Sequence, residues 1–132
     1  MGIYDDLAAI KGSGTPFDKL IPVSPGGIEK IRMDIESVPI DFLSFLLEIG
    51  SGEIGKAAYM IYGDLLVPEE IFGESPPSLD GVVIFGDDFQ GFSSGYRIKD
   101  WVVVEIDSTN MSVHVVAADF QSFIREAVKA VG

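Results

Sequence analysis

The sequence contains no cysteine, one histidine, and only nine basic residues against twenty-one acidic ones. The absence of cysteine excludes a disulfide framework, a cysteine-ligated zinc site and a cysteine nucleophile. No apolar run approaches the ~20 residues that a membrane-spanning helix needs, so we expect no contact with a membrane. The first residues include Asp5 and Asp6, whereas a secretory leader would be basic there, so we expect a cytoplasmic protein.

Acidic residues dominate the charge of the chain, whose formal net charge is −12. This charge argues against nucleic acid as a partner, because the phosphates would be repelled. Residues 57–96 include no lysine or arginine at all. An acidic segment of this kind either keeps a solvated face soluble or docks a basic partner, whose association it would accelerate. Seven acids lie in it: Asp64, Glu69, Glu70, Glu74, Asp80, Asp87 and Asp88.

The stretch from Val82 to Asp107 organises the predicted fold. It reads as a strand, an acidic glycine-rich turn, a second strand, a tight turn and a third strand, which is typical of an antiparallel meander. Further strands are expected at 57–62 and 112–117, with a short one near residue 64. A chain of 132 residues that is 47% hydrophobic is long enough to bury a core as one domain without metal or disulfide.

Helices are expected before and after this meander in the chain, and they should cover one face of its sheet. Residues 3–11 suggest a short helix, Ser24-Pro25 and Pro39 are helix starts, and Asp119 would cap a helix over 120–131. The prediction is therefore one α+β domain, with a mixed, mainly antiparallel sheet of about five or six strands flanked by N-terminal helices and a C-terminal helix. Other expected core residues are Phe17, Leu20 and Ile21 in the early loop, and Phe120, Phe123, Ile124, Val128 and Val131 along the last helix.

None of the candidate catalytic or ligand motifs is convincing. Residues 50–55 match G-x-G-x-x-G, but a helix precedes them and a strand follows, the reverse of a dinucleotide site. His114 alternates with valines as an ordinary strand histidine would. Asp87 and Asp88 fail the calcium-loop pattern and read as a solvated turn, so a small hydrolase using this pair is disfavoured. We therefore predict no catalytic, cofactor-binding or metal-binding residue, and no enzyme.

Several motifs, taken in order, resemble the SUKH superfamily, which includes the yeast cell-wall assembly regulator domain and many bacterial immunity proteins. The resemblance spans about residues 24–132, with 1–23 forming an additional helix and loop. Val38 and the Asn-Gly-Gly position at Gly50-Ser51-Gly52 depart from the usual pattern. The similar segments are Val38 to Leu46, Gly50 to Gly52, Leu66-Val67-Pro68, Ile84 to Asp88 with Gly91, and Phe120 to Ile124.

The resemblance implies an α+β fold and a protein that works by binding. Bacterial members typically neutralise a toxin domain, often a nuclease, and an acidic surface suits a basic toxin. The alternative is a general protein-interaction or regulatory adaptor unrelated to toxins; the oligomeric state stays open. The predicted contact residues comprise acids that steer the partner and aromatic rings that anchor it: Glu69, Glu70, Glu74, Asp87, Asp88, Phe92, Tyr96 and Trp101.

Overall fold

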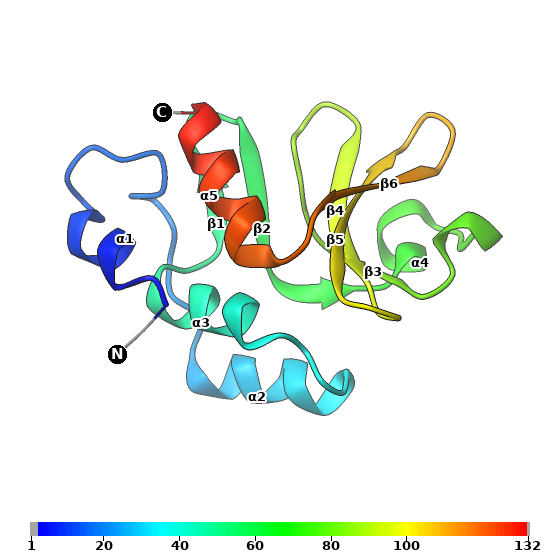
Figure 1. Cartoon of the computed structure of the whole chain (residues 1–132), viewed down its shortest axis with the longest axis horizontal. Helices are drawn as coiled ribbons and strands as arrows, with labels where there is room; N and C mark the ends of the chain where they lie inside the picture. The colour runs from blue at the N-terminus through cyan, green and yellow to red at the C-terminus, as the bar shows by residue number, and fades with distance from the viewer. Residues whose placement is uncertain (1–2, 132) are drawn as a thin grey trace.

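The computed structural model describes residues 3–131, with side chains through residue 129. It shows an α+β domain with one antiparallel sheet (Figure 1). The helices are α1 (Asp5–Ile10), α2 (Pro25–Asp34), α3 (Ile40–Glu48), α4 (Pro68–Phe72) and α5 (Phe120–Val131), with a 3-10 turn, η1 (Pro77–Leu79). The strands are β1 (Gly52–Ile54), β2 (Tyr59–Leu66), β3 (Val82–Asp87), β4 (Phe92–Arg97), β5 (Val102–Asp107) and β6 (Ser112–Ala117).

The six strands lie in chain order, β1 to β6, and each pairs with the next. All five pairings are antiparallel, so the described part of the sheet contains no parallel pair and the mainly antiparallel prediction is confirmed. Register shifts occur in the β2–β3, β3–β4 and β5–β6 pairings, which is where bulges bend and twist a sheet. The meander therefore runs from one edge at β1 to the other at β6.

The larger core lies between the sheet and the helices α1, α2, α3 and α5, which gather on one side in Figure 1. Its centre is a cluster of aromatic rings. Phe85 of β3 packs edge-on against Phe120 of α5 at 5.0 Å between ring centroids, and Phe42 of α3 packs against Phe120 at 5.1 Å. Edge-to-face pairs of this kind contribute about 1 kcal/mol each beyond the area that they bury. The rings therefore fix α3 and α5 on the sheet.

A second, smaller core lies on the opposite face of the sheet. Val82 and Ile84 belong to it, while Val83 and Phe85 belong to the larger one, because successive side chains of a strand point to opposite faces. The connection from α4 through η1 covers this face, with Leu79 only 1% exposed. Helices were predicted over one face only, so this second layer is a difference from the prediction.

Local chemistry explains where the main helices begin. The Ser24 hydroxyl accepts a hydrogen bond from the Gly27 N–H, as the capping interpretation predicts, and Pro25 is the first helical residue. Asp119 accepts a bond from the Ser122 N–H at the start of α5. Gly50 follows α3 with a φ of 123° and lies so close to Ile21 that a Cβ would be 2.3 Å from the Ile21 carbonyl carbon. Only glycine fits there.

Several local predictions were wrong. The third strand of the meander was expected to span Trp101–Ile106, but Trp101 lies in the turn before β5 with a φ of 57°, and its N–H bonds to the Arg97 carbonyl. Phe17 and Leu20 are buried as expected, but the Ile21 side chain is 72% exposed. Ile21 is held in place by its backbone, which forms hydrogen bonds with the backbone of Ser51. Strand β1 was not predicted. The Val131 side chain, expected in the apolar stripe of α5, lies outside the described residues.

Candidate interaction surface

The acidic turn between β3 and β4 uses its carboxylates to hold its own backbone. One Asp87 oxygen accepts a bond from the Phe89 N–H at 2.9 Å, and the other accepts one from the Tyr62 hydroxyl. One Asp88 oxygen accepts bonds from the N–H groups of Gln90 and Phe92. These bonds are those of Asx-type turns, in which the side chain substitutes for a backbone acceptor. Both aspartates are therefore structural as well as charged.

The glutamates on and after α4 are in a different situation. Glu69, Glu70 and Glu74 are all exposed. Glu70 reaches back to the Val67 N–H at 3.4 Å, a long bond at the start of α4. Among the described residues, the side chains of Glu69 and Glu74 take part in no hydrogen bond or ion pair. These two carboxylates are thus free to face a partner.

Ion pairs neutralise little of the acidic segment. Within the part of the chain that the structure describes, Asp64 is the one member of the segment that pairs with a cation, at 3.5 Å from the Lys30 ammonium. The other bridges lie elsewhere, including one from Arg125 to Asp6. In Figure 1, α4 lies at the end of the molecule away from α1 and α5. The free acids therefore give that end a negative field.

The three predicted aromatic anchors have different environments. Phe92 is 36% exposed and lies at the end of the acidic turn, as an anchor would. Tyr96 is fully buried between the rings of Phe42 and Phe85, so the expectation that it is exposed was wrong. Trp101 is half-buried and packs edge-on against Tyr96 at 5.2 Å. Tyr96 is not exposed because rings from distant parts of the chain, Phe42 and Phe85, pack around it, and Trp101 packs against it in turn.

The structure also places Phe89 at the surface, a residue that the sequence analysis did not select. It lies at the tip of the acidic turn, is 47% exposed, and has a φ of 63°. A bulky residue in the left-handed region is uncommon and is held there by the Asp87 and Asp88 bonds around it. Phe89 and Phe92 are thus both exposed in a turn that carries two carboxylates, and only the turn geometry reveals the role of Phe89.

A further acidic group lies on the helix-covered face near β6. Glu105 of β5 pairs in register with His114 of β6, and burial, together with the charges of Asp88 and Asp107, raises the pKa of the Glu105 carboxyl. His114 lies in β6, as its predicted strand position implies, and is exposed, with its Nε2 3.3 Å from the Ser112 hydroxyl.

Three tyrosine hydroxyls are buried inside the larger core. The side chains of Tyr4, Tyr59 and Tyr96 have hydroxyl oxygens without a hydrogen-bond partner among the described residues. Burial is the main cause that raises the pKa of each of them. They stay neutral at physiological pH, and all three side chains belong to the larger core.

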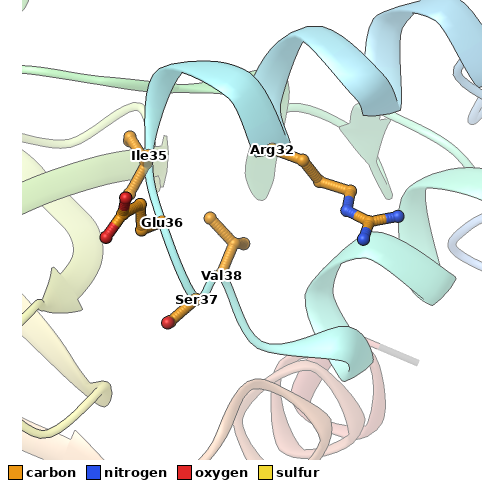
Figure 2. A pocket seen from close by; sticks show the side chains of 5 residues that line it. All are labelled: Arg32, Ile35, Glu36, Ser37 and Val38. Atoms are coloured by element: carbon orange, nitrogen blue, oxygen red, sulfur yellow. The ribbon is translucent and has the colours of Figure 1, made fainter.

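Two pockets on the surface are large enough to hold a small ligand. Figure 2 shows the first, about 410 Å³, in the turn from α2 to α3, lined by Arg32, Ile35, Glu36, Ser37 and Val38. The Arg32 guanidinium and the Glu36 carboxylate point away from each other there, so the charged groups do not converge. The second, about 450 Å³, lies between β6 and α5 and is mostly apolar.

Within residues 3–131 no cluster of three or more potential metal ligands occurs, and no helix is both long and apolar enough to span a bilayer. As predicted, a helix (α3) precedes the G-x-G-x-x-G segment at residues 50–55; β1 lies within the segment and β2 follows it. No protein-family model matches the chain, and neither does any curated protein sequence.

Proposed function

We propose that the protein binds a basic protein partner and acts by covering that partner's working surface, as an immunity protein does with a toxin domain. The observation that carries the proposal is the set of exposed, unpaired carboxylates around α4 in a chain of net charge −12. A concentrated field of one sign raises the rate at which an oppositely charged protein arrives. Binding of this kind requires no chemistry on the protein's own surface.

The resemblance to the SUKH superfamily is the reason for proposing a toxin domain as the partner. Its segments meet in the centre of the fold: Phe42 comes from the α3 segment, Phe85 from the β3 segment and Phe120 from the α5 segment, and the three rings contact one another. Asp41, the acid of the α3 segment, also accepts a bond from Gln121 at the start of α5. The resembling residues thus form one packed unit, which supports treating them as a single pattern.

The partner-facing surface is assigned to Glu69, Glu70 and Glu74, with Phe89 and Phe92 as aromatic contacts. Large rings contribute disproportionately to binding energy when they become buried at the centre of an interface. Asp87 and Asp88 add charge and shape the turn that presents these rings. Trp101, which packs against buried Tyr96 on the face of the larger core, is not part of this surface.

The functional test is co-expression with the C-terminal domain of whatever protein the neighbouring gene encodes, which the proposal expects to be a toxin. Rescue of cell growth, together with a stable complex in size-exclusion chromatography, is the expected result. Binding without rescue, or a complex with an unrelated regulatory protein only, would favour the adaptor alternative. No complex with any neighbouring gene product would remove the toxin proposal.

The surface assignment needs variants that leave the fold intact. Charge reversal at Asp87 or Asp88 would break turn hydrogen bonds, so a loss of binding there would be ambiguous. The double variant Glu69→Lys, Glu74→Lys changes two exposed carboxylates that hold nothing in place. We expect it to slow association with the toxin domain about tenfold at low salt, with a weaker dependence of the rate on ionic strength.

The matched control is Glu29→Lys, Glu36→Lys. These glutamates are also exposed and unpaired among the described side chains, they lie on and after α2, and the double variant changes the net charge by the same amount. Equal slowing by both double variants in stopped-flow measurements would show that only net charge matters, and the α4 assignment would then be wrong.

A further inference from the structure

The outer edge of β6 is open. Among the strands that the structure describes, β6 pairs with β5 alone, so no strand adjoins its other side. Three consecutive residues, His114 to Val116, are exposed, which means that both faces of the strand are open there. Val115 is 54% exposed and Val116 45%. An edge strand with exposed β-branched residues and no lysine or proline has none of the usual protection against pairing with another chain.

An apolar pocket adjoins this edge on the helix-covered face. Its walls are Val116 and Ala117 of β6 and the side of α5 that carries Phe123 and Ala127, and its volume is about 450 Å³. Ser122 and Glu126 complete the lining. A strand that pairs with an exposed edge gains main-chain hydrogen bonds, and a neighbouring pocket can select one of its side chains. The open edge and the pocket together have this arrangement.

The charges around the edge indicate what kind of segment fits. Glu126 lies on the pocket wall, and Glu105 lies on the same face, since it alternates along β5 with Val104 and Ile106 of the smaller core. The acidic connection reaches this edge too: the Ser78 hydroxyl of η1 donates to the Met111 carbonyl just before β6, and Asp80 follows exposed. A second copy of the chain, with its own net charge of −12, would be repelled by these carboxylates, so a basic segment fits the edge better.

From this open edge, the pocket and the surrounding carboxylates, we propose that β6 accepts an extended, basic segment of a partner protein as an added antiparallel or parallel strand. An apolar side chain of the segment enters the pocket between β6 and α5, while its lysines or arginines face Glu126, Glu105 and Asp80. The inference rests on the proposed function for the basic character of the occupant, but it assigns a different element of the fold to the contact.

The test uses a defined probe, a peptide of about six residues with alternating lysine and valine, which has the length of an average strand. A matched peptide with serine in place of valine carries the same charge without the apolar side chains. We expect calorimetry to show saturable binding of the lysine–valine peptide and about tenfold weaker binding of the lysine–serine peptide. Hydrogen exchange should show new protection of the amides of residues 113–117.

The decisive variant is Val116→Asp. It adds a negative charge, so purely electrostatic attraction of the peptide would strengthen, whereas a carboxylate at the pocket should weaken insertion of an apolar side chain about tenfold. The matched control is Val67→Asp, since Val67 is an equally exposed valine at 44% and aspartate is a favourable residue at its helix N-cap position. We expect Val67→Asp to bind the peptide at least as well as the unchanged protein.

If Val116→Asp unfolds the protein, Ala127→Glu blocks the pocket from the α5 side instead, where glutamate is a good helix former. Equal binding of the two peptides, tighter binding by Val116→Asp, or protection confined to residues 87–92 would each overturn the inference. Two results together, without peptide, would also overturn it: self-association in sedimentation runs and protection of the β6 amides in hydrogen exchange. The occupant of the edge would then be a second copy of the chain. Failure of the toxin rescue with intact peptide binding would instead count against the proposed function alone.

Discussion

Asp41 joins the beginnings of two helices that are far apart in the sequence. One of its carboxylate oxygens accepts a bond from the Phe42 N–H at 2.9 Å, and the other accepts one from the Gln121 N–H at 3.0 Å, in the first turn of α5. The side chain is half-buried. A hydrogen bond to a charged group contributes about 1.5–3 kcal/mol, and a carboxylate at a helix N-terminus also interacts favourably with the helix dipole.

Substitution of this residue should therefore be costly. Asp41→Ala leaves two partly buried N–H groups without their acceptor, and we expect it to lower the free energy of unfolding by about 3 kcal/mol. Asp41→Asn keeps one carbonyl oxygen and loses the charge, so about half of that loss is expected. Urea unfolding followed by circular dichroism measures both changes, provided that the slope of the transition stays constant.

Asp119 supplies the comparison, because it caps the same helix from an exposed position. Its carboxylate accepts one bond, from the Ser122 N–H at 2.8 Å, and Asp119→Ala should cost only about 1 kcal/mol. We therefore expect Asp41→Ala to cause the largest loss in the free energy of unfolding. Asp41→Asn should cause a smaller loss, and Asp119→Ala a loss no larger than that of Asp41→Asn. If Asp41→Ala costs no more than Asp119→Ala, the link between α3 and α5 contributes nothing beyond ordinary capping.

Two other changes test separate parts of the fold. Gly86→Ala would place a Cβ 2.2 Å from the Met60 carbonyl oxygen on the adjoining strand, and a loss of about 3 kcal/mol in urea unfolding is expected, whereas Gly26→Ala, 3.9 Å from its nearest neighbour, should be neutral or stabilising. Hydrogen bonds from the Thr15 hydroxyl and from two glycine N–H groups lower the pKa of the Asp18 carboxyl to about 2. The Asp18 carboxylate therefore stabilises the fold fully above the unfolded-state pKa of aspartate, and this stabilisation is lost as the pH falls through about 2. Asp18→Asn should therefore be less stable than the unchanged protein at pH 6, with the gap closing below about pH 4; a gap that is constant down to pH 2 would contradict this assignment.

Local signals were sufficient for most elements of the fold. The hydroxyl of Ser24 before Pro25 marks the start of α2, and the alternation around His114 marks β6, because both depend on residues next to one another in the chain. Strand β1 has three residues and is positioned by long-range pairing, including the bridge from Ile21 to Ser51. Its sequence has no periodicity long enough to predict it. The layer around Leu79 escaped prediction for a similar reason, since it lies directly after two prolines.

The candidate surface was predictable in charge and not in detail. A segment without cations must present acids to solvent, and Glu69 and Glu74 do so. The pattern could not distinguish them from Asp87, whose carboxylate is bound by the Phe89 N–H and the Tyr62 hydroxyl. It also could not show that Tyr96 is buried, because β4 carries few apolar residues and the rings that bury Tyr96 come from α3 and β3.

The distinction between bound and free carboxylates decides where binding should be sought. An aspartate that already accepts two backbone N–H groups, as Asp88 does, would have to give up those bonds to form new short contacts with a partner's cations. Exposed glutamates such as Glu69 and Glu74 give up only water, so the same attraction costs less to realise. On the proposed function, we therefore expect the turn of Asp87 and Asp88 to act mainly by presenting Phe89 and Phe92 and by adding to the long-range field. We expect the charged contacts at α4 and, for an extended partner segment, at the edge of β6.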